Sequence, residues 1–141
     1  MTEPDETARY ARQIPVLGRD GQKRLKDARV FIAGAGGLGT VISTYLALAG
    51  IGYLRIADCD HVEETDLNRQ ILHWEEDIGK SKADSIREKL VRMNPHINID
   101  TIDERITSEN AWHMTDGCGL LVDALDNFAA RYLLNCIALK R

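Results

Sequence analysis

The sequence has few of the residues that disulfide-rich and metal-binding proteins depend on. Among its 141 residues are three cysteines, Cys59, Cys118 and Cys136, and no two of them form a C-x-x-C pair. The four histidines are scattered and match no metal-ligand spacing. We therefore expect three buried free thiols, no zinc site, and a reducing compartment, which by default is the cytoplasm.

Long apolar runs and clusters of basic residues are also missing. No run approaches the roughly 20 apolar residues that cross a bilayer, and the acidic, polar residues 1–13 do not read as a secretory signal. A net charge of −4 without a basic stripe weighs against a nucleic-acid partner. With 44% hydrophobic and 28% charged residues, the composition is that of a globular domain with no membrane segment.

The order of the predicted elements indicates the fold class. Residues 1–27 are polar and helix-prone, with a break at 16–18, and then strands and helices alternate. The predicted strands are 28–33, 53–58, 97–102 and 120–123, and the predicted helices are 40–49, 80–93, 108–114 and 127–141. Gly50 should end the first of these helices, Ser108 should cap the third, and Asn127 or Phe128 should open the last. This alternation predicts a Rossmann-like, doubly wound α/β fold with a mostly parallel sheet, preceded by N-terminal helices.

A glycine-rich motif lies between the first predicted strand and the following helix. Residues 34–39 read G-x-G-x-x-G, where glycines let the backbone approach a phosphate and the helix N-terminus adds partial positive charge. Asp58 ends the second strand and is placed to accept hydrogen bonds from ribose hydroxyls. A nucleotide site is expected, although these two features suit a dinucleotide as well as ATP, and a turn needed only for packing remains an alternative.

Polar motifs outside the glycine loop favour a triphosphate. Arg9 and Arg12 precede the first strand, D-L-N-R-Q at 66–70 follows the second, G-K-S-K-A at 79–83 opens the next helix, and D-A-L-D-N at 123–127 follows the fourth strand. A dinucleotide needs little help from cations. A triphosphate that is attacked at its α-phosphorus needs charge neutralisation and usually a divalent metal.

With these five motifs in this order, the chain resembles the ThiF/MoeB/HesA family, relatives of the ubiquitin-activating enzymes, from Arg9 to about Asn135. The resemblance implies a homodimeric adenylyltransferase that uses ATP and Mg²⁺. Its partner would be a small ubiquitin-like or sulfur-carrier protein, as in thiamine or molybdopterin biosynthesis, whose C-terminal Gly-Gly carboxylate is adenylated with release of pyrophosphate. The family continues further, so we expect one nucleotide-binding domain over 1–141, with a helical arm at 1–27, a sheet part at 28–141, and the C-terminal half of the family domain absent.

The resemblance also implies roles for single residues. Loop glycines and a ribose-binding acid would contact the nucleoside, and amides and cations would contact the phosphates. The implied nucleotide-binding residues are Gly34, Gly36, Gly37, Gly39, Asp58, Asn68, Arg69, Gln70, Lys82, Asp126 and Asn127. Arg69, Lys82 and Asp126 are implied to be catalytic, with Asp126 as the magnesium ligand. Arg12 would be a fourth catalytic residue, a finger that reaches into the partner subunit's site.

Simpler explanations stay open at this stage. Arg12 could pair with Glu6, and Lys80 and Lys82 could form a solvated first helical turn, although cations there oppose the helix dipole. Asp66 stands where the family usually has asparagine, and an acid near phosphates should weaken binding unless it faces a cation. Two other functions are also open: an NAD-dependent oxidoreductase, and a non-catalytic nucleotide-binding or dimerisation module.

Overall fold

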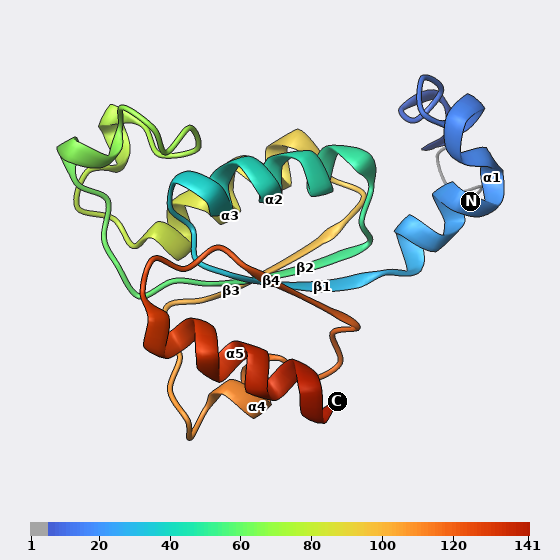
Figure 1. Cartoon of the computed structure of the whole chain (residues 1–141). Helices are drawn as coiled ribbons and strands as arrows, with labels where there is room; N and C mark the ends of the chain where they lie inside the picture. The colour runs from blue at the N-terminus through green and yellow to red at the C-terminus, as the bar shows by residue number, and fades with distance from the viewer. Residues whose placement is uncertain (1–5) are drawn as a thin grey trace.

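A computed structural model describes residues 6–141 and confirms the predicted α/β class. A four-stranded parallel sheet lies between two layers of helices (Figure 1). In chain order the elements are η1 (Glu6–Ala8), α1 (Ile14–Asp27), β1 (Arg29–Ala33), α2 (Gly37–Ala49), β2 (Tyr53–Ala57), η2 (Glu64–Asp66), η3 (Glu75–Asp77), α3 (Lys82–Met93), β3 (Asn98–Ile102), α4 (Ala111–Met114), β4 (Leu120–Asp123) and α5 (Phe128–Lys140).

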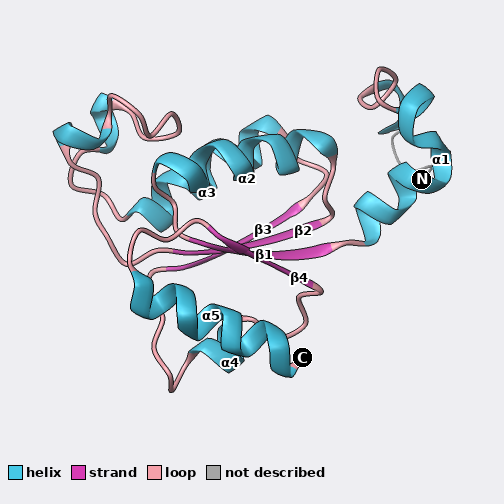
Figure 2. Cartoon of the chain, viewed as in Figure 1, coloured by secondary structure: helices cyan, strands magenta, loops and turns pink. Residues whose placement is uncertain are grey.

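The strand order determines where a ligand can bind. The sheet runs β3-β2-β1-β4, and each neighbouring pair is parallel (Figure 2). The chain builds outward from β1 to β3 and then returns to place β4 on the other side of β1. In open parallel sheets, ligands bind at this reversal, at the carboxyl ends of the strands. Within residues 6–141, β3 and β4 each pair on one side only, so each leaves an open edge.

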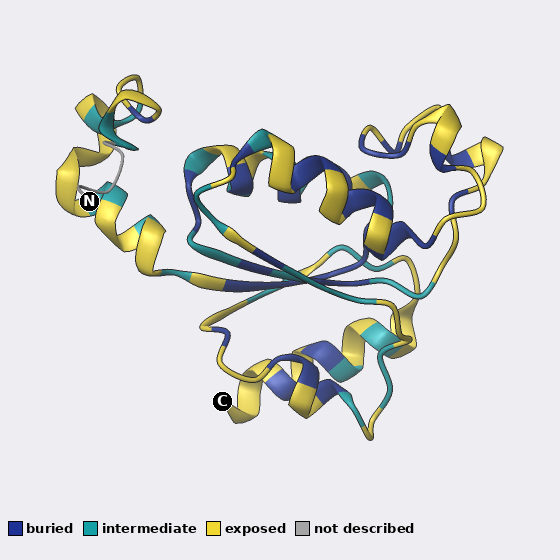
Figure 3. Ribbon diagram, turned by 180° about the vertical axis from the view of Figure 1, so that it is seen from behind, coloured by how far each residue is buried: buried dark blue, intermediate teal, exposed yellow. Residues whose placement is uncertain are grey.

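Alternate residues of the central strand point into two hydrophobic clusters. Val30 and Ile32 of β1 face the layer formed by α2 and α3, where Ile86 and Leu90 are fully buried. Phe31 and its neighbours face the opposite layer, which contains α4 and α5. Figure 3 shows buried residues in the helices of both layers. The sheet therefore holds helices on both faces, as the doubly wound prediction requires.

The N-terminal arm is attached at one end of α2. Tyr10 is 4% exposed, and its hydroxyl accepts a hydrogen bond from Asn94 at 3.0 Å. The Gln13 amide donates to the carbonyl of Ala49 at 2.8 Å, in the last turn of α2. The helix α1 breaks at Gly18, where φ is +74°, which confirms the break predicted at 16–18. Residues 1–5 of the predicted arm lie outside the described residues.

The start of α3 differs from the prediction. The helix begins at Lys82 with Ser81 as its N-cap, so Lys80 is not part of it. Backbone hydrogen bonds hold residues 80–82 against the end of the β2 loop: Val62 N–H donates to the Lys80 carbonyl, and Lys82 N–H donates to the Asp60 carbonyl. Pairing with this distant segment prevents the first helical turn that the local pattern suggested.

Two of the three predicted helix caps are confirmed. Gly50 ends α2 in the left-handed region with φ +88°, and the Asn127 side chain accepts a backbone N–H in the first turn of α5. The cap predicted at Ser108 is wrong. Its hydroxyl instead donates to Glu109, and α4 begins only after Asn110.

The cysteine prediction is only partly correct. Cys118 is buried and Cys59 is half-buried, but Cys136 is exposed on α5, so the expectation of three buried thiols is wrong there. All three are free thiols. Across residues 6–141, no helix is both long and apolar enough to span a bilayer.

Candidate functional site

Two of the loop glycines are required by close packing. Gly34 has φ +104°, and a Cβ there would lie 2.6 Å from the Ala124 carbonyl oxygen, just after β4. A Cβ on Gly39 would lie 1.9 Å from the Gly34 carbonyl oxygen. Any side chain at these positions would force backbone to move, so Gly34 and Gly39 bring the start of α2 close to β1 and β4.

The other two glycines face more open space. A Cβ on Gly36 would come no nearer than 3.7 Å to the Gln70 side chain, and one on Gly37 no nearer than 3.8 Å to Arg69. Gly37 is also the first residue of α2, where backbone N–H groups and the helix dipole favour an anion. The side of the loop that borders Arg69 and Gln70 is thus the side suited to phosphate.

Asp58 is hydrogen-bonded to the glycine loop. Its Oδ2 accepts the backbone N–H of Ala35 at 2.7 Å, and its Oδ1 accepts the N–H of Asp60 at 2.8 Å. A carboxylate has about four lone-pair positions, so both oxygens can accept further donors. Asp58 can therefore shape the loop and still accept ribose hydroxyls.

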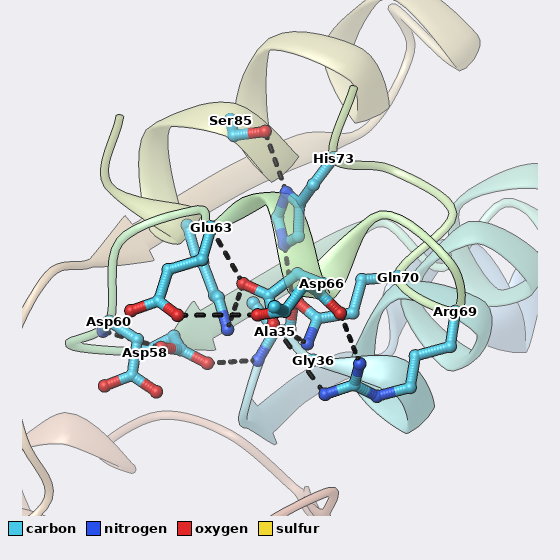
Figure 4. Close-up of polar contacts among 12 residues, drawn as sticks. Ala35, Gly36, Asp58, Asp60, Glu63, Asp66, Arg69, Gln70, His73 and Ser85 are labelled. Carbon is cyan, nitrogen blue, oxygen red and sulfur yellow. Dashed lines mark hydrogen bonds and ion pairs between the residues drawn. The ribbon is translucent and has the colours of Figure 1, made fainter. Parts of the chain in front are cut away.

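Asp66 organises the loop between β2 and α3 (Figure 4). It is 7% exposed and accepts the Glu63 N–H at 3.0 Å and the Gln70 amide at 2.8 Å. Its oxygens also lie 3.2 Å from Lys82 Nζ and 3.7 Å from Arg69 Nη2. Burial alone would raise the pKa of Asp66, but the Glu63 N–H, Lys82 and Arg69 together lower it. The acid that replaces the family's usual asparagine thus faces two cations.

The two cations differ in exposure. The Arg69 side chain is 58% exposed, and its guanidinium donates to the Thr65 carbonyl at 2.8 Å and to Asn68 Oδ1 at 3.0 Å. The Lys82 side chain is only 8% exposed. Arg69 is therefore held in place yet open to a ligand, and Lys82 contributes its charge from inside the loop. Both keep N–H donors that these contacts do not use.

Lys80 does not join this group. Its ammonium lies 3.2 Å from Asp77 and 3.5 Å from Glu88. Because its charge is paired with these two acids, Lys80 does not belong with the cations beside Asp66. Only Lys82 stands in the first turn of α3, where a cation opposes the helix dipole.

The loop after β4 carries the predicted metal ligand. Asp126 is exposed and takes part in none of the ion pairs formed by residues 6–141, whereas Asp123 accepts Leu125 N–H and pairs with Arg131. No group of three or more His, Cys, Asp or Glu in this part of the chain could hold a metal by itself. Mg²⁺ commonly takes one or two carboxylates together with waters and substrate phosphates, so a single free carboxylate such as Asp126 fits its usual requirements.

Arg12 lies away from the other predicted residues. It is exposed, and Glu6 pairs with Lys26 rather than with Arg12. The neighbouring Tyr10 and Gln13 are fixed at the C-terminal end of α2, whereas the glycine loop is at its N-terminal end. A helix of 13 residues is about 20 Å long, much longer than an arginine side chain. Figure 1 likewise places the arm and the loop before α3 at opposite ends of the molecule.

A buried polar network beside the loop is not predicted from the sequence. His73 is 3% exposed, with Nε2 2.8 Å from the Ala35 carbonyl oxygen and Nδ1 2.8 Å from Ser85 Oγ. Lys89 Nζ lies 3.1 Å from the same Oγ and pairs with the buried Asp77. Burial, aided by the nearby lysine charges, lowers the pKa of His73, so its imidazole is neutral near pH 7.

The spacing of two lysines in the sequence is a signal for part of this polar network. Lys82 and Lys89 are seven residues apart, about two helical turns, and so lie on one face of α3. Each pairs with an aspartate, Asp66 or Asp77, that stands at the third position of a short 3₁₀ turn. Two acids in the loop, each paired with one of two lysines on the same helix face, fasten the loop twice to α3.

Proteins of similar sequence and fold are known. The ThiF family model matches residues 10–141. A probable adenylyltransferase/sulfurtransferase, MoeZ of Mycobacterium tuberculosis, is 48% identical over 133 residues, 93% of this chain and 34% of the relative. The sulfur carrier protein adenylyltransferase of Thermus thermophilus is 43% identical, over 93% of this chain and 49% of the relative. The crystal structure of E. coli tRNA N6-threonylcarbamoyladenosine dehydratase, TcdA, in complex with ATP matches with a TM-score of 0.90 and 27% identity, over 99% of this chain and 59% of that chain.

The match is nearly complete for this chain but partial for its relatives. The chain spans about a third to a half of the length of the two curated relatives. The matched part contains the glycine loop, the Asp66 loop and the loop after β4. The chain belongs to the ThiF family.

Proposed function

We propose that this chain supplies the nucleotide site of an ATP-dependent adenylyltransferase, whose substrate is the C-terminal Gly-Gly carboxylate of a small ubiquitin-like or sulfur-carrier protein. Its relatives include a sulfur carrier protein adenylyltransferase and a fold neighbour crystallised with ATP. The substrate class comes from that similarity, and the site residues supply the physical argument.

One observation carries the proposal: Asp66 is paired with two cations, Arg69 and Lys82, and Arg69 borders the open side of the glycine loop. Phosphate at the start of α2 would meet backbone N–H groups, the exposed guanidinium of Arg69 and the charge of Lys82. A guanidinium suits phosphate because its planar fork donates two hydrogen bonds and stays charged. A nicotinamide dinucleotide has no leaving pyrophosphate, so its chemistry would not use the exposed guanidinium of Arg69 to stabilise a leaving group.

The proposed reaction is an in-line displacement at the α-phosphorus. A carrier carboxylate oxygen forms a bond to that phosphorus while the bond to the α–β bridging oxygen breaks, giving an acyl-adenylate and pyrophosphate. Negative charge develops on the leaving pyrophosphate, and Arg69, Lys82 and the N-terminus of α2 would stabilise it. Asp58 would hold the ribose, while Asn68 and Gln70 keep Arg69 and Asp66 in place.

Magnesium would be held by Asp126, with Asn127 beside it at the start of α5. A bound Mg²⁺ neutralises phosphate charge and orients the phosphates for displacement. The carboxylate of Asp126 is exposed, forms no ion pair within residues 6–141 and lies after the carboxyl end of β4, so it is suited to that ligation.

A homodimer forms part of the proposal. Because Arg12 is separated from its own glycine loop by the length of α2, it could serve only the site of a second subunit. An apolar row of Leu38, Val41, Tyr45 and Leu48 is exposed along α2, and Tyr45 is 70% exposed. Such a row is suited to burial against a second copy. We further propose that the protein works in the cytoplasm, in the thiamine, molybdopterin or a related sulfur-transfer pathway.

The proposal is tested by ligand-dependent thermal stabilisation of this chain. We expect MgATP to raise the melting temperature more than NAD or NADP does at equal concentration, because the ligand with the lower Kd stabilises the native state more. A ligand at 100 times its Kd stabilises by about 2.7 kcal/mol. Arg69→Gln should reduce the MgATP effect. The matched control is Arg92→Gln, an exposed arginine in the last turn of α3 that should leave the effect unchanged. Equal or greater stabilisation by NAD would reject adenylation in favour of a dinucleotide enzyme.

The carrier is tested by ATP–pyrophosphate exchange in a preparation that binds MgATP. A sulfur-carrier protein with a free Gly-Gly terminus should support exchange, whereas the same carrier with an amidated C-terminus should not. Exchange that is independent of the carrier would overturn the substrate class while leaving the nucleotide site in place. MgATP binding without any exchange would favour a non-catalytic nucleotide-binding module.

A further inference from the structure

Ala35 in the glycine loop is held from both sides. Its N–H donates to Asp58 Oδ2 at 2.7 Å, and its carbonyl oxygen lies 2.8 Å from His73 Nε2 (Figure 4). The first contact comes from the end of β2 and the second from the loop before α3. The two contacts fix consecutive peptide units at the centre of the G-x-G segment.

The contacts of His73 determine which ring nitrogen carries the proton. The Ala35 carbonyl can only accept, so Nε2 must be the N–H donor. In a neutral imidazole Nδ1 is then an acceptor, and the Ser85 hydroxyl donates to it. Lys89 in turn donates to Ser85 Oγ and pairs with Asp77. All contacts in this series, from Asp77 to the Ala35 carbonyl, therefore favour the tautomer that is protonated on Nε2.

This tautomer has a consequence for the next residue. The C=O of Ala35 and the N–H of Gly36 belong to one planar trans peptide unit and point in opposite directions. Because the Ala35 carbonyl points at His73, the Gly36 N–H points away from it. That N–H donates to no acceptor within residues 6–141. A buried histidine thus aims a free backbone donor out of the glycine loop.

We propose that His73 is a positioning residue for the nucleotide, which acts by orienting the peptide between Ala35 and Gly36, and that Ser85 and Lys89 fix its tautomer. The ligand class, a nucleotide phosphate, rests on the proposed function. The orientation of the loop does not, so it can be tested without any ligand.

The tautomer is read by long-range ¹H–¹⁵N NMR of the histidine rings in the nucleotide-free chain, with His73 assigned from the spectrum of His73→Gln. We expect Nε2 protonated and Nδ1 unprotonated. Ser85→Ala removes the donor to Nδ1 but keeps the Ala35 carbonyl at Nε2, so a minor fraction protonated on Nδ1 should become detectable. The matched control is Ser43→Ala: Ser43 is equally buried, but its hydroxyl bonds only within α2, so His73 should be unchanged. A wild-type His73 protonated on Nδ1 would overturn the proposal.

Orientation of the loop is read by amide hydrogen exchange at Ala35, whose N–H is bonded to Asp58 Oδ2, and by MgATP affinity. Loss of one buried hydrogen bond corresponds to about a tenfold change in each measurement. His73→Leu should show that change, whereas His73→Gln should stay near wild type, because its amide N–H can still donate to the Ala35 carbonyl. If His73→Leu does not fold, Ser85→Ala serves in its place.

The results separate this proposal from the proposed function. Wild-type chain that binds no MgATP, with the tautomer and exchange results as expected, would reject the nucleotide function and leave the loop-orienting role intact. Normal loop exchange and normal MgATP affinity in both His73→Leu and Ser85→Ala would reject the role of His73 while the nucleotide function stands.

Discussion

The carboxylate of Asp66 lies 3.2 Å from the ammonium of Lys82, and both side chains are at most 10% exposed. The pair joins the loop after β2 to the first turn of α3. The buried pair itself carries no net charge. The remaining positive charge in this loop is then that of Arg69, which is the more exposed of the two cations.

Removing the negative charge of Asp66 should destabilise the protein. In Asp66→Asn the hydrogen-bond acceptor remains, but Lys82 loses its buried partner, so we expect a loss of about 3 kcal/mol in urea unfolding. The control is Asp27→Asn, which removes only the surface pair with Lys23 and should have almost no effect. Equal effects of the two substitutions would mean that Asp66 does not anchor the loop.

Asp77 should make the stability depend on pH in the acid range. Burial raises the pKa of Asp77, but Lys89, the Trp74 N–H and Lys80 hold it at about 2, against 3.8 for a free side chain. The unfolded chain therefore takes up the proton first, and the stabilisation, present in full above 3.8, is lost as the pH falls to about 2. After allowance for solvent screening, we expect ionised Asp77 to contribute about 1 to 2 kcal/mol to the free energy of unfolding. The measurement is the stability difference between wild type and Asp77→Asn, which should shrink over this interval; a constant difference would refute the assignment.

The glycines of the loop should separate into two classes. Gly39→Ala places a Cβ against the Gly34 carbonyl and should cost about 3 kcal/mol in thermal or urea unfolding. Gly37→Ala meets only the flexible Arg69 side chain, so its stability should stay within about 1 kcal/mol of wild type. Its MgATP affinity should nevertheless fall, because the new methyl group occupies the phosphate side of the loop. A stable Gly39→Ala protein would contradict this division.

The position of Arg12 at the far end of α2 predicts complementation between subunits. Arg12→Ala and Asp126→Ala should each abolish carrier-dependent exchange in an active preparation. When the two variants are mixed, half of the dimers carry one intact site under random pairing, so activity should recover to roughly a quarter of wild type. If mixed dimers form and no activity returns, Arg12 does not act across the interface.

Local patterns were sufficient for much of the fold. Gly50 and Asn127 end or begin helices as predicted because their backbone preference or side-chain cap acts within a few residues. Lys80 was misplaced because its conformation depends on hydrogen bonds to residues 60–62, which no local pattern contains. Ser108 does not cap a helix, and its hydroxyl donates to the neighbouring Glu109 instead.

In the candidate site, too, some features could be predicted from the sequence and others could not. Its glycines and cations stand in contiguous motifs, so their presence was predictable from the chain. The support beneath them was not, because His73 meets Ala35 and Ser85 only after β1, the loop and α3 have packed together. The partner of Asp66 is likewise not predictable from the sequence, since the distance from Asp66 to Lys82 depends on the path of the intervening loop.

The open edge of β4 has a consequence for handling the protein. Most of that strand consists of apolar residues, Leu120, Leu121 and Val122, and Leu120 is 56% exposed. On the neighbouring α5, Phe128 and Tyr132 are at least 70% exposed. Unpaired backbone beside exposed apolar side chains is a template for strand exchange between molecules. A purified preparation of residues 1–141 should therefore aggregate through this side of the sheet as its concentration rises, and a lysine at position 120 should keep it in solution.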